Sequence, residues 1–128
     1  MKKLLLIFTL LFSTAMSSSP VRAEWTRVSK NMNGNTFYVD LERIRKHDGY
    51  VYFWDLVDYL KPTETGVWSV KVYTQGDCKL FRVKRLSFSF HKEPMGEGTG
   101  NSFNPDQDWQ YPPPNSSRET VLKLVCSQ

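Results

Sequence analysis

The sequence has few of the residue types on which enzymes most often rely. It holds two histidines and two cysteines, and neither a GxSxG nor an HExxH motif occurs. His47 falls in a predicted turn, and His91 lies at the end of a predicted strand. Asp55 and Asp58 are three residues apart on one predicted strand, so they point to opposite faces and cannot share acid–base work. The sequence therefore predicts no catalytic residue, no metal site and no cofactor.

Long apolar runs are also scarce, and the one at the N-terminus is too short to cross a membrane. Residues 4–12 are apolar almost throughout, whereas a transmembrane helix needs about 20 such residues. Two lysines precede this run, and residues 21–23 end in alanine, as a signal-peptidase site does. This order favours a secretory signal peptide over a membrane anchor. We expect a signal peptide at 1–23 and a single mature domain at 24–128.

The predicted export route follows from two further absences. No cysteine lies near the cleavage site, so we expect no lipid anchor. No second long apolar segment follows, so we do not expect the mature chain to span a membrane. The sequence therefore predicts a protein that is periplasmic or secreted.

An excess of positive charge is largely confined to the predicted signal peptide. The full chain carries 17 basic and 13 acidic residues, for a net charge of +4. Lys2, Lys3 and Arg22 belong to the signal peptide, and without them 14 basic residues face 13 acidic ones. This near balance argues against a nucleic-acid ligand.

The two cysteines, Cys78 and Cys126, are far apart in the chain. In an oxidising compartment two lone cysteines most often pair, whereas redox catalysis favours a CxxC motif and metal binding needs more ligands. We therefore expect a structural disulfide. The loop that it closes holds about 50 residues, for which the chain-entropy model gives roughly 4 kcal/mol of stabilisation.

The mature chain has a mostly β pattern. A single helical turn is predicted at 41–45. A long loop is predicted at 92–108, because glycines and prolines interrupt the apolar pattern there. Strands are predicted at 25–29, 36–40, 50–60, 67–74 and 79–90, with a short one at 109–111.

One helix is predicted at the C-terminus, after three prolines. Ser116 and Glu119 have the spacing of a capping box. One apolar face follows, formed by Val121, Leu122, Val125 and Cys126. A disulfide to Cys78 would therefore attach the buried side of this helix to the end of the fourth predicted strand.

The fifth predicted strand changes phase in its middle. Phe81 and Val83 share one phase, and the apolar residues from Leu86 onward share the other. A β-bulge at Lys84 and Arg85 would keep the apolar residues on the core face and turn both cations outward.

The strongest binding candidate is the basic patch on this strand. It comprises Arg82, Lys84 and Arg85, with Lys71 from the neighbouring strand. Such clusters contact acidic glycans or acidic protein surfaces, although a solvated face with no ligand is the alternative.

The third predicted strand is apolar on both faces, which predicts cover on both faces. Tyr52 and Trp54 lie on one face. Val51, Phe53 and Val57 lie on the other. Since one helix covers only one side of a sheet, the Val51 face is a candidate for self-association as a homodimer.

Several segments in order resemble the surface-adhesin protein E family of Gram-negative bacteria. They cover the whole mature chain, and the match rests on the set rather than on any one motif. The segments are "WTRVSKNMNGNTFYVDLERIR", "VYFWDLVDYLKP", "GDCKLFRVKRL", "EPMGEGTG" and "PPPNSSRETVLKLVC".

The resemblance implies a fold more firmly than a function. It implies an α+β, mostly β fold: an antiparallel sheet, of about five or six strands here, whose C-terminal helix is tied to it by a disulfide. It also implies secretion and adhesion to host proteins. We therefore expect a secreted, non-enzymatic, adhesin-like domain that contacts extracellular proteins or acidic glycans. The alternative is a small periplasmic structural or envelope-associated protein without catalytic activity.

Overall fold

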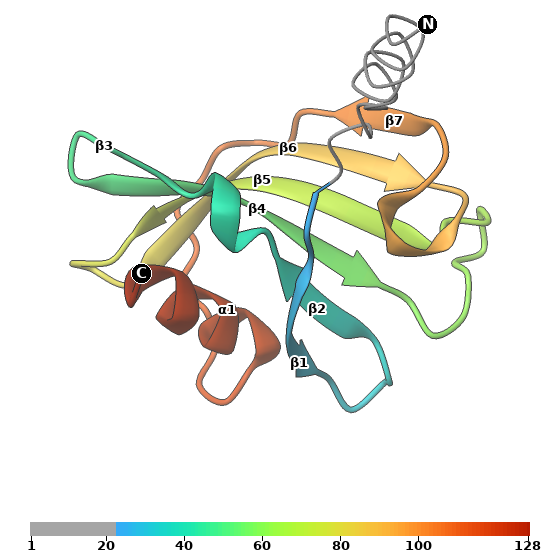
Figure 1. Cartoon of the computed structure of the whole chain (residues 1–128), viewed down its shortest axis with the longest axis horizontal. Helices are drawn as coiled ribbons and strands as arrows, with labels where there is room; N and C mark the ends of the chain where they lie inside the picture. Colours follow the sequence, from blue (N-terminus) through green and yellow to red (C-terminus); the bar gives the residue numbers. More distant parts are fainter. Residues whose placement is uncertain (1–22) are drawn as a thin grey trace, which may run out of the picture.

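The computed structural model describes residues 23–128 as one twisted sheet with a helix against one face (Figure 1). The strand order is β1-β2-β4-β5-β6-β7, and β3 pairs with β4 beyond the end of β2. All pairs are antiparallel, as expected. The signal peptide predicted at 1–23 lies outside the described residues, except for Ala23.

Most of the predicted elements form close to their expected positions. The predicted turn after β2 is a 3₁₀ helix at Leu41–Arg43, and the helix α1 spans Ser117–Cys126. The strands are β1 at Thr26–Lys30, β2 at Thr36–Val39, β3 at Arg45–His47, β4 at Tyr50–Asp58, β5 at Ser69–Asp77, β6 at Arg82–His91 and β7 at Gly100–Phe103.

Two short strands, β3 and β7, were not predicted. β3 reaches β4 through a tight turn in which Asp48 and Gly49 both have positive φ, of 51° and 83°. Asp-Gly is a preferred pair for such a turn, because glycine adopts positive φ without steric cost. β7 forms within the predicted long loop and pairs with β6. The short strand predicted at 109–111 is a single bridge, between Val83 and Gln110.

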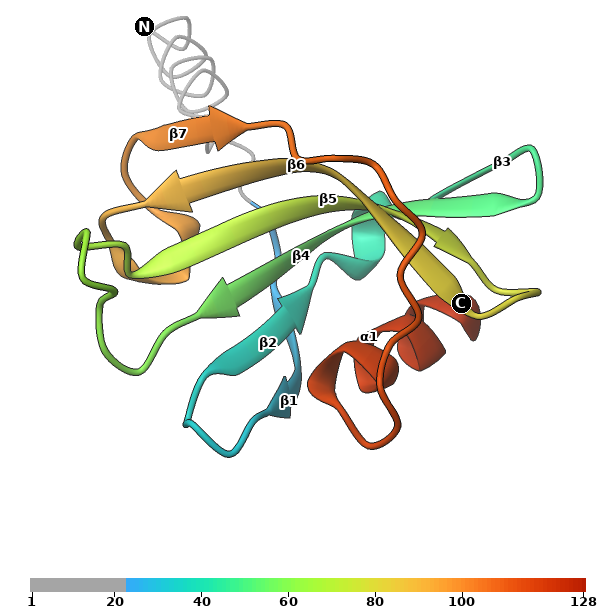
Figure 2. The same cartoon turned by 180° about the vertical axis from the view of Figure 1, so that it is seen from behind.

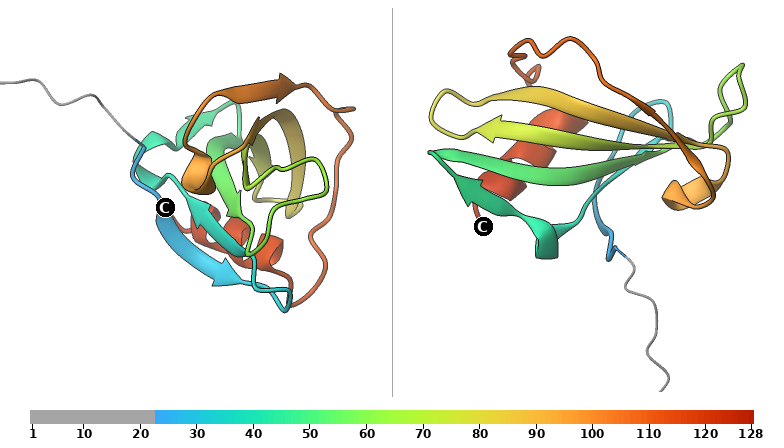
Figure 3. Two further views of the ribbon diagram at one scale, coloured as in Figure 1. Left: turned by 90° about the vertical axis from the view of Figure 1, so that its right-hand side faces the viewer. Right: turned by 90° about the horizontal axis from the view of Figure 1, so that it is seen from above.

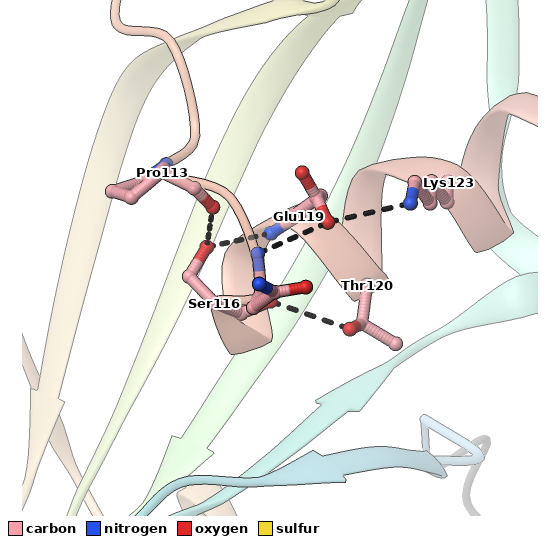
Figure 4. A network of polar contacts seen from close by, with 6 residues as sticks. Pro113, Ser116, Glu119, Thr120 and Lys123 are labelled. Atoms are coloured by element: carbon pink, nitrogen blue, oxygen red, sulfur yellow. Dashed lines mark hydrogen bonds and ion pairs between the residues drawn. The ribbon is translucent and has the colours of Figure 1, made fainter.

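The start of α1 has the predicted capping interaction (Figure 4). The Ser116 hydroxyl accepts a hydrogen bond from the Glu119 N–H at 3.1 Å. The Glu119 carboxylate in turn accepts from the Asn115 N–H at 3.2 Å. The Ser116 hydroxyl donates to the Pro113 carbonyl at 2.6 Å, which fixes the polyproline segment against the first turn. These bonds satisfy groups that the end of a helix otherwise leaves unpaired.

The helix covers one side of the sheet, here called the helix face (Figure 3). Val121, Leu122 and Val125 are buried there against β2 and β4. Gly76 makes the close approach possible. A Cβ atom at Gly76 would lie 3.1 Å from Leu122 Cδ1 and 2.8 Å from a methyl carbon of Val51.

The predicted disulfide is present. Cys78 directly follows β5, and its Sγ is bonded to that of Cys126 in the last turn of α1, with 5.7 Å between the Cα atoms. The bond therefore attaches the far end of the helix to the sheet, as the apolar pattern of the helix indicated.

The proposed apolar surface for self-association is wrong. Val51, Phe53 and Val57 belong to the hydrophobic core and are 7%, 1% and 5% exposed. They point toward α1, so the helix covers the face that was expected to need a partner. The other face of β4, with Tyr52 and Trp54, is the half-open one.

Candidate binding surface

The sheet face opposite α1, here called the open face, carries aromatic and basic side chains. Residues paired across antiparallel strands project to the same face, and the register therefore groups them. Tyr52 pairs with Gln75, which pairs with Lys84, and Trp54 pairs with Tyr73. The rings and cations of the open face are those of Tyr50, Tyr52, Trp54, Lys71, Tyr73, Arg82 and Lys84.

Trp109 lies over one end of the open face. The Arg82 guanidinium carbon is 4.2 Å from the centroid of its ring, and Lys84 Nζ is 4.5 Å away. The ring of Tyr50 lies 5.6 Å from it, centroid to centroid. Two cations on one indole are a favourable electrostatic arrangement, because the face of an aromatic ring is negative. We call these four residues the Trp109 cluster.

The segment that carries Trp109 runs alongside β6 between β7 and α1 (Figure 2). It is held by two backbone hydrogen bonds of 2.8 Å between Val83 and Gln110. This bridge lies next to Trp109 in the chain, so it fixes where the indole meets β6. The segment predicted as a short strand at 109–111 thus supplies part of the surface.

Arg82 is fixed by an ion pair. Its Nε donates to Asp77 Oδ2 at 2.9 Å, and both side chains are largely buried. The other Asp77 oxygen accepts from the backbone N–H groups of Leu80 and Lys79, each at 3.1 Å. The hydrogen bond from the Leu80 N–H, with those from Arg82 and Lys79, lowers the pKa of Asp77. Arg82 therefore holds the turn between β5 and β6 as well as facing Trp109.

Lys84 and Lys71 are the cations of the open face without a carboxylate partner. Neither forms a salt bridge within residues 23–128. Lys84 projects beside Arg82, whereas Lys71 lies toward the opposite end of β5. Three of the four residues of the predicted basic patch thus share this face.

Arg85, the fourth residue of the predicted patch, points to the helix face. The predicted bulge in β6 exists, but Leu86 is the extra residue, since Arg85 pairs with Thr74 and Ser87 with Tyr73. The prediction that Arg85 turns outward with Lys84 is therefore wrong. Regular alternation continues through Val83, Lys84 and Arg85, which places the first and last of these on one face.

On the helix face Arg85 lies near a buried acid. It lines the same small cavity as Asp55 and Arg118. Burial, together with repulsion from Arg118, lowers the pKa of Arg85 to about 10. Burial also raises the pKa of Asp55, whose Oδ2 accepts from the Thr74 hydroxyl at 3.1 Å. Arg85 thus lies on the helix face, where its guanidinium also donates to Gln110 Oε1 at 2.7 Å, and not in the patch with Lys84.

The aromatic rings continue from the Trp109 cluster toward a cavity. Tyr52 and Tyr73 have ring centroids 6.3 Å apart, and those of Tyr73 and Trp54 are 4.9 Å apart. Trp54 forms part of a cavity of about 310 Å³ on the open face. We call it the tryptophan cavity; its lining includes Trp25, Asp40, Arg43, Trp54 and Lys71.

Sequence reasoning identified the cations but missed the indole between them. Trp109 is separated from β6 by the whole of β7 and its flanking loops, and no local pattern placed it beside Arg82. The alternation along β4 did indicate that Tyr52 and Trp54 share one face.

Residues 23–128 also lack the features of two other kinds of site. No group of three or more His, Cys, Asp or Glu side chains is close enough to hold a metal ion there. Among these residues no helix has the length and apolar character that crossing a membrane requires.

Residues 25–127 match the family described as surface-adhesin protein E. The chain matches no curated protein sequence. The match covers nearly all of the described chain, so the fold, the disulfide and the open face all lie within it.

Solved structures of protein E from Haemophilus influenzae share the fold. One is 22% identical with a TM-score of 0.59, and covers 88% of this chain and 90% of that one. A second crystal form is 23% identical with the same TM-score, over 88% and 97%. Protein E from a non-typeable strain is 21% identical, with a TM-score of 0.56 over 88% and 81%. At these identities the likeness establishes the fold alone.

Proposed function

This chain belongs to the surface-adhesin protein E family, and from that premise we propose that it is an exported, non-enzymatic binding domain. Its ligand is an acidic group of an extracellular protein or glycan. The contact involves Lys84 and Arg82 around Trp109, with Lys71 further along the same face. The observation that carries the proposal is the pair of cations at 4.2 and 4.5 Å from one indole centroid, on the face that α1 leaves open.

The arrangement suits an anionic ligand for a physical reason. Each cation is attracted to the negative face of the indole, but the two positive charges repel one another, and a bound anion would offset that repulsion. Lys84 has no carboxylate partner within residues 23–128, so its charge is available to a ligand. Arg82 is pre-oriented by Asp77, which reduces the entropy lost on binding.

Export follows from the predicted signal peptide at 1–23, which places the mature domain in the periplasm or outside the cell. The absence of a cysteine near the predicted cleavage site supports release without a lipid anchor. Recovery of the chain from periplasmic extract, culture medium or washed cell surfaces distinguishes these destinations. A cytoplasmic, uncleaved chain would contradict the proposal.

Lys84→Glu is the sharpest test of the cation surface. Reversal at Arg82 would place a second carboxylate beside Asp77 and disturb the turn, so Arg82→Gln is the suitable companion. Lys61→Glu is the matched control, because Lys61 is exposed in the loop between β4 and β5. The ligands are immobilised sulfated glycan, uronate glycan and extracellular matrix proteins.

We expect Lys84→Glu to lose binding while Lys61→Glu retains it, with both variants melting as the wild type does. Binding should weaken with added salt, because exposed charges are screened over about 8 Å at physiological ionic strength. If no ligand of this panel binds in a manner that depends on Lys84, the binding proposal fails. A structural protein of the envelope is then the better description.

A further inference from the structure

The tryptophan cavity is the second feature of the open face, and it differs from the Trp109 cluster in being concave. Its volume of about 310 Å³ is at the lower end of the range of about 300–1,000 Å³ that small-molecule sites occupy. Trp25 reaches it from the residue before β1, and Trp54 from the middle of β4. Two indoles from distant parts of the chain thus meet around one hollow.

A buried carboxylate oxygen in this cavity has no hydrogen bond. Asp40 is 1% exposed, and its Oδ1 accepts from the Glu42 N–H at 3.2 Å. Its Oδ2 accepts no hydrogen bond within residues 23–128, although Arg43 Nε lies 3.5 Å away as an ion pair. This oxygen has almost no accessible surface, so a ligand atom does not reach it, and the carboxylate instead fixes Arg43 in the cavity wall.

The remaining polar lining complements a ligand with several hydroxyls and one negative charge. Lys71 lines the cavity and forms no hydrogen bond or ion pair within the described residues. With the Asp40–Arg43 pair balanced, Lys71 leaves one positive charge to be neutralised. Ala23 also lines the cavity, so the predicted cleavage after it would add the ammonium group of the new N-terminus nearby. The serine hydroxyls of Ser87 and Ser102 also line the cavity, from β6 and β7.

We propose that the tryptophan cavity binds one acidic sugar ring, with its carboxylate at Lys71 and its C–H face against an indole. A pyranose has an apolar C–H face as well as a hydroxyl edge. Its slightly positive C–H bonds suit the negative face of an indole. The inference deepens the proposed function, on which it rests, by selecting an acidic glycan over an acidic protein.

The larger cavities of the described residues lack these features together. Three have volumes of about 420 Å³, and none has a tryptophan in its lining. The rings of Tyr52 and Tyr73 lie between the tryptophan cavity and the Trp109 cluster. A glycan chain with one acidic ring in the cavity would therefore extend along aromatic side chains toward Lys84.

The test uses protein purified from the periplasm and the matched probes methyl glucuronide and methyl glucoside. The probes share a ring and differ in the carboxylate. Indole N–H signals in NMR spectra report binding, and we expect the glucuronide to shift those of Trp25 and Trp54 saturably. Because a hydrogen-bonded charge contributes about 1.5–3 kcal/mol, the glucoside should bind at least about tenfold more weakly.

Lys71→Gln should abolish this tenfold preference, and Lys61→Gln should preserve it. If Lys71→Gln does not fold, Trp25→Ala decides the matter, since it removes a wall of the cavity but no core contact, and it should lose glucuronide binding. A uronate oligosaccharide added in parallel distinguishes a polymer ligand from a free sugar, because only the polymer should gain affinity from Lys84.

Failure of the inference is distinguishable from failure of the proposed function. Two results overturn the cavity assignment. In one, the glucuronide shifts the indole N–H signal of neither Trp25 nor Trp54. In the other, it binds Lys71→Gln as tightly as the wild type. Lys84-dependent binding of polymer would still stand in that case. If glucuronide binds in the cavity but no ligand depends on Lys84, the sugar site stands and the proposed cation surface is refuted.

Discussion

The two faces of one strand, β4, have opposite roles in this molecule. Phe53 points to the helix face and is 1% exposed. Its neighbours Tyr52 and Trp54 point to the open face and remain partly accessible. The sequence makes both faces equally apolar, so hydrophobicity by itself does not tell the core from the binding surface. The difference lies in what covers each face. A helix covers one side, whereas the other has a tryptophan with two cations at one end and the 3₁₀ helix Pro94–Gly96 over the buried Leu56 at the other.

Adjacent substitutions on β4 should give the largest contrast. Phe53→Glu removes a buried ring, which costs about 3–5 kcal/mol, and places a charge in the core at further cost. This approaches the whole stability of a small domain, about 5–15 kcal/mol, so we expect an unfolded chain. Tyr52→Glu should cost only about 1 kcal/mol through the lost contact with Tyr73.

Circular dichroism and thermal melts of the two variants check this prediction. A folded Phe53→Glu protein with a changed oligomeric mass in light scattering would contradict it. That result would mean that the Val51, Phe53 and Val57 face opens in solution and is not a closed core.

Loss of the disulfide should have the next largest effect, because it releases only the helix face. Cys126→Ser should lower the free energy of unfolding by about 4 kcal/mol in urea titrations, the cost expected for a loop of this length. Reduced wild-type protein should match the variant. An unchanged denaturation midpoint, or two reactive thiols in the unreduced protein, would refute the structural role of the bond.

Gly76→Ala should have a moderate effect confined to the same face. The added methyl would meet Val51 at 2.8 Å and Leu122 at 3.1 Å, so it pushes the helix from the sheet. We expect a loss of about 1–3 kcal/mol, as for other overpacked cores. Gln75→Ala, one residue earlier and on the open face, is the control and should change urea stability much less. Equal losses from the two variants would contradict the close packing of α1.

The smallest effect concerns two buried aspartates, one on each face. Burial raises the folded pKa of Asp55, so its contribution to stability is complete below the ordinary pKa of about 3.9 and is lost as pH rises through the folded value. Hydrogen bonds from Leu80, Arg82 and Lys79 lower that of Asp77. Its contribution is complete above about 3.9 and is lost as pH falls through the folded value.

Removing each carboxylate should therefore tilt the stability curve in opposite directions. Relative to the wild type, the free energy of unfolding of Asp55→Asn should increase as pH rises. That of Asp77→Asn should increase as pH falls. Urea titrations between about pH 3 and 7 measure both. Curves that tilt the same way would show that the two carboxylates do not have opposite environments.

Local patterns predicted most of the fold but only part of the binding surface. Alternation located the long strands, and the Ser116 and Glu119 spacing located the helix, because these signals lie within a few residues of one another. β3 and β7 were missed, since they form short pairings that depend on β4 and β6 being in place. Arg85 was assigned to the wrong face because a phase change shows that a bulge exists but not which residue is extra.

The sequence by itself determined the β character, the terminal helix and the pairing of Cys78 with Cys126. Each depends on residue type and spacing along the chain or on there being no other cysteine. Only the tertiary structure decided which face of β4 the helix covers, and only it brought Trp109 to Arg82 and Lys84 and Trp25 to Trp54. These choices depend on contacts between residues distant in the chain, whose energies come from burial and register and leave no local pattern.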